Sequence, residues 1–220
     1  MIAKQLYSPV TTLDALMIRK VSSHGIGYSV ADLDHARYIF AAALPRQGSD
    51  LAAQATDALS TIHNVLQSEG CCAASIVQQS VFISDHDEID ACKQIMRDFY
   101  GDDLPATTYV VQPPCDGKLL AIEAWGVCQG SNGKAIYIER VSEHLVIVRH
   151  GGVEWAHVAG IVPQTDASGV YARTADSLRR MRDILATRGF TFDQVIRTWF
   201  YLGDIVGPEG DTQRYKELNR

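Results

Sequence analysis

The sequence predicts an α+β protein that contains two tandem copies of one small module, and the main reason is an internal repeat. Residues 52–85 align without gaps onto residues 171–204 at a constant offset of 119. Identical matched pairs include Asp57 and Asp176, Leu59 and Leu178, Leu66 and Leu185, Gly70 and Gly189, and Asp85 and Asp204. Upstream, Pro45 matches Pro163 with a one-residue slip. Because self-similarity at a fixed offset indicates repeated structural units, we expect the order helix, glycine, strand and aspartate twice.

The spacing of apolar residues defines the elements of the first copy. Residues 38–44 are apolar and end at Pro45, which predicts a strand. Residues 50–69 carry apolar residues at helical spacing and end at Gly70, a residue type common just past helix ends. The remaining predicted elements are a strand at 76–84, a helix at 88–100, and strands at 107–112 and 119–127.

The second copy repeats this order but ends earlier. Its predicted elements are strands at 136–138, 145–149 and 155–162, a helix at 170–188, a strand at 195–202, and the start of a helix at 211–220. The end of that last helix and both final strands of the module are missing, so we expect the natural chain to continue past Arg220. A turn-like stretch at 129–133 separates the copies. The predicted modules are therefore residues 1–130 and an incomplete 134–220.

Composition and charge narrow the classes of function. The chain has 220 residues, of which 46% are apolar and 21% charged, as in an ordinary globular protein. Its net charge of -6 argues against a nucleic-acid partner. The N-terminus has no signal-peptide core, and no apolar stretch is long enough to span a bilayer. We therefore expect a cytoplasmic protein with no membrane partner.

The five cysteines do not form a recognisable metal or disulfide pattern. Their number is odd, no C-x-x-C pair occurs, and no Cys/His group has zinc-ligand spacing. We expect reduced, mostly buried thiols. His150 and His157 lie near acidic residues in the sequence, but their spacing matches no ligand set. The sequence predicts neither a metal nor another cofactor.

Several short motifs resemble the RidA/YjgF family. Residues 105–107 (Pro-Ala-Thr) and 122–124 (Ile-Glu-Ala) are similar to that family's C-terminal signature, P-A-R followed by E-I-E-A. Residues 27–29 (Gly-Tyr-Ser) resemble its G-P-Y-S motif, and Tyr28 precedes Pro45 by the family's distance of 17 residues. The second copy resembles the family at residues 160–163 and 215–219. These motifs occur in the order and at the spacing of that family. Together the similarity covers most of residues 24–220.

This resemblance implies a fold, an assembly and an activity. The fold is chorismate-mutase-like, with a mixed β-sheet backed by two helices in each module. Family members are typically homo-oligomers, namely trimers, with ligand clefts between subunits, and many hydrolyse imines such as 2-iminobutanoate or 2-iminopropanoate. The resemblance makes Glu123 the candidate catalytic residue that positions water. It makes Tyr28, Thr107, Gly160 and Asn219 candidates for binding a small carboxylated metabolite.

The first copy also departs from the family pattern. Thr107 stands at the position of the arginine whose guanidinium fork grips the substrate carboxylate. Ala121 replaces the first glutamate of E-I-E, and Lys93 stands where the family has Asn. These changes predict a degenerate first site. They leave open the alternative of a non-catalytic ligand-binding module. They also leave open that Glu123 is a structural carboxylate rather than an acid/base group.

A second resemblance gives a third hypothesis, a chorismatase-like hydrolase. Residues 197–201 (Arg-Thr-Trp-Phe-Tyr) are similar to a segment of the chorismatases, which also carry RidA-like modules. In an extended strand Arg197, Trp199 and Tyr201 point to one face, where a cation flanked by aromatic rings suits an anionic ring ligand. We take Arg197 and Tyr201 as candidate binding residues. The alternative is that the aromatic residues pack in a core or an interface.

Overall fold

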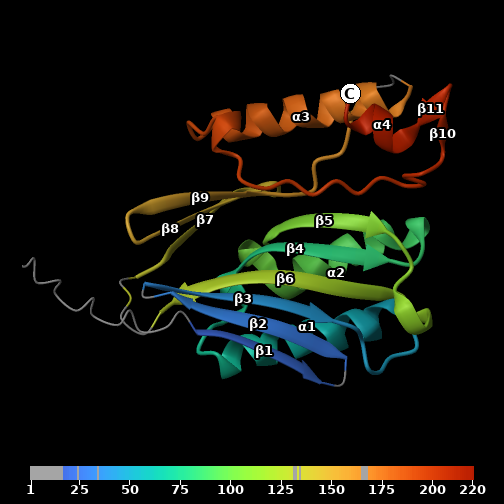
Figure 1. The fold of residues 1–220 in the computed structure, drawn as a ribbon. Coiled ribbons are helices and arrows are strands. Elements are labelled where there is room, and N and C mark those ends of the chain that lie inside the picture. The colour runs from blue at the N-terminus through green and yellow to red at the C-terminus, as the bar shows by residue number, and fades with distance from the viewer. Residues whose placement is uncertain (1–16, 24, 34, 131–132, 134, 165–167) are drawn as a thin grey trace, which may run out of the picture.

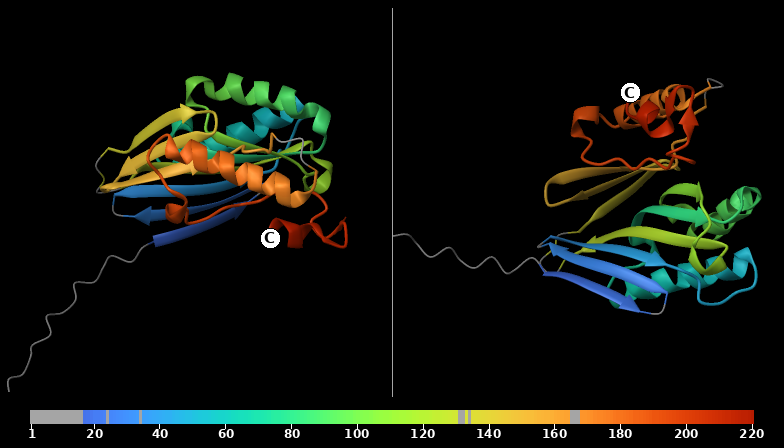
Figure 2. Two further views of the ribbon diagram at one scale, coloured as in Figure 1. Left: turned by 90° about the horizontal axis from the view of Figure 1, so that it is seen from above. Right: turned by 45° about the vertical axis from the view of Figure 1, so that its right-hand side comes forward.

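The computed structural model describes residues 17–23, 25–33, 35–130, 133, 135–164 and 168–220 (Figure 1). Its centre is a six-stranded β-sheet, which has helices α1 and α2 on one face. A three-stranded sheet packs on part of the other face, which we call the outer face. Figure 2 shows these layers from two further sides. The predicted α+β class is therefore confirmed.

The six-stranded sheet has the order β1-β2-β3-β6-β4-β5. Its strands are β1 (Met17–Ser23), β2 (Ile26–Leu33), β3 (Ala36–Ala43), β6 (Leu120–Gln129), β4 (Ile76–Ile83) and β5 (Ala106–Val111). Only β4 and β5 are parallel neighbours, so the sheet is mixed. The strands predicted from 38 to 127 are present. The sequence pattern did not indicate β1 and β2, whose alternation of apolar and polar residues is weak.

The main core lies between the six-stranded sheet and its two helices. Helix α1 (Leu51–Ser68) begins where the Asp50 carboxylate accepts a hydrogen bond from the Ala53 N–H at 2.8 Å. Helix α2 (Ile89–Tyr100) lies beside α1. The largest fully buried side chains of this core are Ile39, Leu59, Ile62, Leu66, Ile76, Ile83, Met96, Leu120 and Ile122. These residues recur at helical or strand spacing, so the spacing of apolar residues in the sequence was enough to predict these helices and strands.

The second sheet consists of β7 (Tyr137–Ser142), β8 (Leu145–His150) and β9 (Val153–Val158). Val146 and Val148 of β8 pack on the outer face of the large sheet, where they join a cluster with small apolar side chains of β4, β5 and β6. Strand β9 ends at Val158 instead of the predicted residue 162. The chain turns at Gly160, whose φ of +70° is not compatible with a continuing strand.

Aromatic and histidine side chains fill the layer between the two sheets. The Trp125 and His157 rings meet edge to face at 4.8 Å, and the Tyr38 hydroxyl lies 2.5 Å from His150 Nε2. Only 6% of His157 is exposed, and its Nδ1–H donates a long hydrogen bond of 3.4 Å to Gln78. Burial lowers the pKa of His157 to about 4. This inter-sheet contact therefore contains a neutral imidazole at physiological pH.

The rest of the chain forms α3 (Val170–Ala186), the short strands β10 (Pro208–Glu209) and β11 (Thr212–Gln213), and α4 (Arg214–Leu218). The prediction of a strand at 195–202 was wrong, because this segment pairs with no strand among the described residues. Without a neighbour its backbone has no ladder partner, and several apolar side chains stay exposed. The helix expected at 211–220 is shorter because the β10–β11 hairpin occupies its start.

Local features after residue 136 nevertheless match the first half closely. Helices α1 and α3 begin at matched positions, 51 and 170. The Asp57 carboxylate accepts the Arg46 N–H at 2.7 Å, and the Asp176 carboxylate accepts the Gln164 N–H at 2.9 Å. These pairs reproduce the repeat, including its one-residue slip at the prolines. The predicted boundary at 129–133 stays a prediction, and residues 131–132 lie outside the described part.

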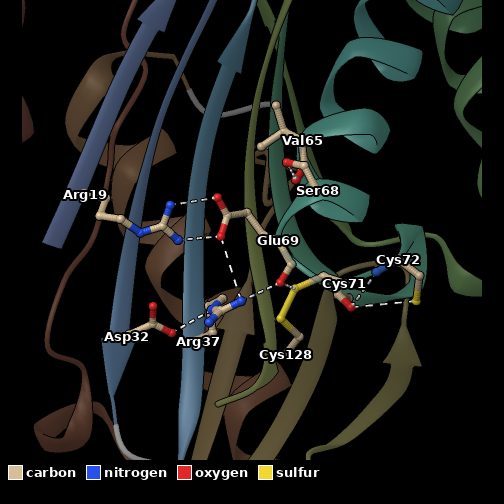
Figure 3. Close-up of a disulfide and its surroundings, with 10 residues drawn as sticks. Arg19, Asp32, Arg37, Val65, Ser68, Glu69, Cys71, Cys72 and Cys128 are labelled. Carbon is tan, nitrogen blue, oxygen red and sulfur yellow. Dashed lines mark hydrogen bonds and ion pairs between the residues drawn. A yellow bond between two sulfur atoms is a disulfide. The ribbon is translucent and has the colours of Figure 1, made fainter. Parts of the chain in front are cut away.

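The expectation of reduced thiols is wrong for two of the cysteines. Cys71 and Cys128 form a disulfide whose Cα atoms are 5.9 Å apart, while Cys72, Cys92 and Cys115 are free (Figure 3). The turn after α1 carries Cys71 to the end of β6. A sequence separation of 57 residues conceals this proximity from any local pattern.

Charged side chains cluster beside the disulfide at the end of α1. The Glu69 carboxylate, only 7% exposed, accepts two hydrogen bonds from the Arg19 guanidinium, at 3.1 and 2.5 Å. Arg37 donates to the Glu69 carbonyl at 2.7 Å and to the Asp32 carboxylate at 2.6 Å (Figure 3). The end of α1 is thereby attached to β1, β2 and β3.

In the described part of the chain, no helix has the length and apolar character needed to cross a membrane.

We predict that the buried imidazole makes stability depend on pH. In the unfolded chain His157 binds a proton below about pH 6.5, whereas in the folded chain its pKa is about 4. Stability should therefore be fully present above pH 6.5 and fall as the pH decreases towards 4, by about 3 kcal/mol from this residue. Urea titrations between pH 4 and pH 7.5 measure the effect. His157→Gln should flatten the slope, and identical slopes in both proteins would contradict the prediction.

Candidate functional site

An open pocket of about 370 Å³ lies on the outer face of the six-stranded sheet. We call it the outer-face pocket. Strands β1, β2, β3, β6 and β4 and their adjoining turns build it. Its lining residues are Ser22, Gly25, Ile26, Gly27, Ala42, Ala43, Leu44, Phe82, Ala121, Ile122 and Glu123. It is the strongest candidate site because a predicted functional residue borders it.

Strand register brings the polar and small residues of the pocket together. Gly27 pairs with Ala42, Ala42 with Glu123, and Glu123 with Ser80. Residues paired across neighbouring strands share one face of a sheet, so this row lies on the outer face. A Cβ added at Gly27 would meet no atom within 4 Å. The two small residues therefore leave the space beside the Glu123 carboxylate empty.

The charge of the outer-face pocket is set by one side chain. Glu123 is the only ionisable residue among those that line it, and it is exposed. Among the described residues it forms no ion pair. An exposed carboxylate accepts hydrogen bonds and attracts cations, whereas the lining residues include no Lys or Arg to hold an anion. The pocket therefore suits a ligand that presents an N–H donor.

Tyr201 reaches the same face from the C-terminal part of the chain. Its hydroxyl lies 3.3 Å from the Ser80 hydroxyl, and its ring meets Phe82 edge to face at 5.8 Å. Ser80 is the direct cross-strand neighbour of Glu123, and Phe82 lines the pocket. The structure thus brings two predicted site residues, Glu123 and Tyr201, to one region of the outer face. It also extends the pocket wall with an aromatic ring.

Arg197 lies in the same extended segment as Tyr201. Its guanidinium stacks on the Trp199 ring, 4.6 Å from the ring centroid. It forms no ion pair with another described residue. Both side chains are exposed, so the stacked pair is accessible to solvent. The predicted alternative in which Trp199 packs in the core of the described chain does not apply.

Tyr28 lies on the opposite face of the sheet from Glu123. It pairs with Ala41 and packs against the helix-side core. Neighbouring residues of a strand point to opposite faces, so Gly27 and Tyr28 cannot both face the pocket. Tyr28 therefore does not share the outer-face pocket with Glu123, and its predicted binding role stays a prediction.

Thr107 also faces the helices, and its hydroxyl is hydrogen-bonded within the protein. It is 7% exposed, and its hydroxyl donates to the Pro105 carbonyl at 2.8 Å and accepts from Gln79 Nε2 at 3.0 Å. Gln79 Oε1 in turn accepts from the Tyr100 hydroxyl at 3.0 Å. Burial raises the pKa of Tyr100, which keeps it a donor. This buried network leaves Thr107 no free hydrogen-bonding group directed at a ligand.

Gly160 and Asn219 lie outside the outer-face pocket. The Gly160 N–H donates to the Thr108 hydroxyl at 2.9 Å, and a Cβ at this position would stand 2.5 Å from the Thr107 carbonyl oxygen. Gly160 is therefore needed for the close approach of the chain to β5. The Asn219 side chain is exposed and donates to the Tyr215 carbonyl at 2.7 Å.

Sequence reasoning missed Ser80, Phe82 and the small residues of the pocket floor. Alternation along 76–84 places Ser80 and Phe82 on one face, but only the register of β4 against β6 relates that face to Glu123. A larger open hollow of about 530 Å³ lies at the start of α2, lined by His86, Asp87, Ile89, Asp90 and Lys93. Among the described residues no cluster of His, Cys, Asp and Glu is suited to a metal ion.

We predict that Thr107→Val destabilises the fold without affecting the outer-face pocket. The change leaves Gln79 Nε2 and the Pro105 carbonyl without their buried partner, which costs about 1–3 kcal/mol. Urea denaturation measures the loss. The matched control is Thr56→Val on the exposed side of α1, where a change of less than about 0.5 kcal/mol is expected. Equal stability of the Thr107 variant and the parent protein would contradict the structural role.

One protein family matches part of the chain. The family described as Endoribonuclease L-PSP matches residues 40–117, from β3 to the turn before β6. None of the curated proteins matches the chain significantly.

Several solved structures resemble a part of the chain. A Mycobacterium tuberculosis member of the YjgF/YER057c/UK114 family is 26% identical, with 42% of this chain and 83% of that protein covered and a TM-score of 0.39. A Yersinia pestis protein of the Rid family is 22% identical, with 44% and 83% covered and a TM-score of 0.40. RidA from an Antarctic Psychrobacter is 17% identical, with 44% and 84% covered and a TM-score of 0.40.

Proposed function

Since the chain belongs to the RidA/YjgF family, we propose that it binds a small nitrogen-containing metabolite in the outer-face pocket. The observation that carries the proposal is the placement of Glu123 beside a floor of Gly27 and Ala42. A carboxylate next to empty space can accept a hydrogen bond from an imine or amine N–H. Phe82 and Tyr201 supply an apolar wall for the rest of the ligand.

Hydrolysis of an imine is the reaction for which this arrangement is suited. Glu123 would accept a proton from water while the oxygen adds to the imine carbon. The same carboxyl would return this proton to the nitrogen, which gives a carbinolamine. It would then carry the proton of the carbinolamine hydroxyl to the amine, so that the C–N bond breaks and a carbonyl compound and ammonia leave. The lining of the outer-face pocket includes no guanidinium to grip a substrate carboxylate, so we propose that binding is retained and that turnover is slow. A substrate without a carboxylate needs no such grip, so it suits the pocket better than 2-iminopropanoate does.

A chorismatase-like activity is the second candidate, and one observation favours it. Arg197 stacks on Trp199 two residues from Tyr201, and its guanidinium has no carboxylate partner among the described residues. An anionic, unsaturated ring could lie on these aromatic side chains with its carboxylate on Arg197. If this candidate is correct, ligand binding depends on Arg197 rather than on Glu123.

The corresponding hydrogen bonds to Asp57 and Asp176 support a duplicated module as the origin of this architecture. We propose that residues 134–220 derive from a second copy of the same unit, and that chains assemble into a homotrimer as the resemblance implies. Sedimentation velocity at several concentrations tests the assembly, and a monomer at all of them would refute the trimer.

We expect Glu123→Gln to weaken binding of small amines and imines about 10- to 100-fold, because a hydrogen bond to a charged acceptor is worth about 1.5–3 kcal/mol. Ligand-observed NMR with alanine-derived imine, ethylamine and chorismate as separate probes measures the affinities. Pyruvate release from 2-iminopropanoate measures turnover. Glu143→Gln, an exposed glutamate outside the pocket, is the matched control. If the two variants bind the amines equally well, the assignment of Glu123 fails. Binding of chorismate that is lost in Arg197→Ala alone would support the second candidate.

A second variant fills the outer-face pocket without altering its charge. Gly27→Val places a β-branched side chain in a strand position where an added Cβ meets nothing within 4 Å. We expect unchanged or slightly higher stability and at least tenfold weaker amine binding, measured by thermal denaturation and by the same NMR titrations. Wild-type affinity in this variant would show that the ligand lies elsewhere.

A further inference from the structure

Strand β1 carries a basic residue on each face of the six-stranded sheet. Arg19 points towards the helices, where its guanidinium donates to the Glu69 carboxylate at 3.1 and 2.5 Å (Figure 3). Because successive residues of a strand face opposite sides of a sheet, Lys20 lies on the outer face. A cation therefore lies on the same face as the outer-face pocket, although it is not one of the residues that line it.

Strand register places Lys20 next to the floor of the outer-face pocket. Ser22, two residues further along β1, lines the pocket and pairs with Gly27. Lys20 pairs with Ser29, so Gly27 is its diagonal neighbour on β2. Diagonal neighbours are about 7–8 Å apart, a distance that a long side chain reaches across. Since Gly27 has no side chain, the Lys20 ammonium group can lie over the pocket floor.

Two opposite charges thus flank the small residues of the pocket floor. Lys20 and Glu123 are both exposed, and neither forms an ion pair with another described residue. The helix side of the same strands differs, because Glu69 is paired there with both Arg19 and Arg37. A ligand with a carboxylate at one end and an N–H donor at the other matches the two charges of the outer face.

The separation of these charges sets the length of such a ligand. The paired row Ser22, Gly27, Ala42 and Glu123 crosses β1, β2, β3 and β6. Neighbouring strands lie about 4.8 Å apart, so β6 is about 10 Å from β2 and about 14 Å from β1. Two charge-assisted hydrogen bonds of about 2.8 Å each leave about 4–9 Å between the nitrogen and the carboxylate of the ligand. An α-amino acid, whose bonds span less than about 4 Å between these groups, is too short.

An aromatic side chain borders the route between the two charges. Phe40 lies in the same paired row as Lys20 and Ser29, and it is 42% exposed. Its ring lies 5.0 Å from the Trp125 ring on the adjacent strand. The exposed part of this ring offers an apolar contact to the methylene groups of a ligand that extends from β6 to β1.

We propose that the ligand of the outer-face pocket is an ω-amino or ω-imino carboxylate, and that Lys20 determines this specificity. The nitrogen of the ligand donates to Glu123, and its carboxylate accepts from the Lys20 ammonium group. The methylene chain between them lies over Gly27 and Ala42 and contacts Phe40. Lys20 thereby supplies from β1 the cation that the pocket lining lacks. This inference rests on the proposed function and specifies the class of its ligand.

Ligands that differ only in the carboxylate or in length test the role of Lys20. In ligand-observed NMR titrations at low salt, 4-aminobutanoate should bind about three- to tenfold more tightly than butylamine, because a partly exposed ion pair contributes little more. Glycine, which is too short for both contacts, should bind more weakly than 4-aminobutanoate. The advantage of 4-aminobutanoate over butylamine should decrease at high salt, since exposed charges are screened.

A charge-removing variant assigns this advantage to one side chain. Lys20→Gln should abolish the advantage of 4-aminobutanoate and leave the affinity for butylamine unchanged, whereas Glu123→Gln should weaken the binding of both. The matched control is Lys216→Gln, which removes an exposed lysine of α4 and should preserve the advantage. Thermal denaturation checks that the variants are folded.

The outcomes separate this inference from the proposed function. If butylamine binds through Glu123 but the added carboxylate gives no gain, or the gain persists in Lys20→Gln, the role of Lys20 is refuted and the proposed function stands. Equal affinity for glycine and 4-aminobutanoate would refute the predicted ligand length. If neither butylamine nor 4-aminobutanoate binds the parent protein, the proposed function and this inference both fail.

Discussion

The whole architecture depends on the central position of β6 between β3 and β4. One strand pairs with β3 on one side and with β4 on the other, so it unites strands that are far apart in the sequence. Its inward residues complete the core beneath α1. Its outward residues Glu123 and Trp125 belong to the pocket and to the inter-sheet layer. The register of this strand therefore determines which side chains meet on each face of the six-stranded sheet.

The second sheet depends on the same strand through packing. Trp125 meets His157 of β9 and Phe40 of β3, while small neighbours such as Ala106 and Val127 allow β8 to approach. Because His157 is buried without a charged partner among the described residues, the contact favours a neutral imidazole. The Cys71–Cys128 disulfide and the Glu69 ion pairs attach the end of α1 to the same region. Residues of both halves of the chain thus contribute to the cluster between the two sheets.

The outer-face pocket follows from missing side-chain volume. Gly27 and Ala42 lack side chains that would fill the space beside Glu123. This empty space forms a cavity for a small molecule because its walls are strands of one sheet.

The sequence by itself determined the elements whose signals are local. Apolar spacing and the glycines at 70 and 189 located α1 and α3, and runs of apolar residues located β3, β4, β5 and β6. Only the tertiary structure decided which faces these elements share. Tyr28 and Thr107 lie with the helices and Glu123 lies opposite, because a change of one residue along a strand reverses the face. The disulfide, the contact of Tyr201 with Ser80 and the unpaired state of residues 195–202 depend on partners distant in sequence, and no local pattern encodes such pairings.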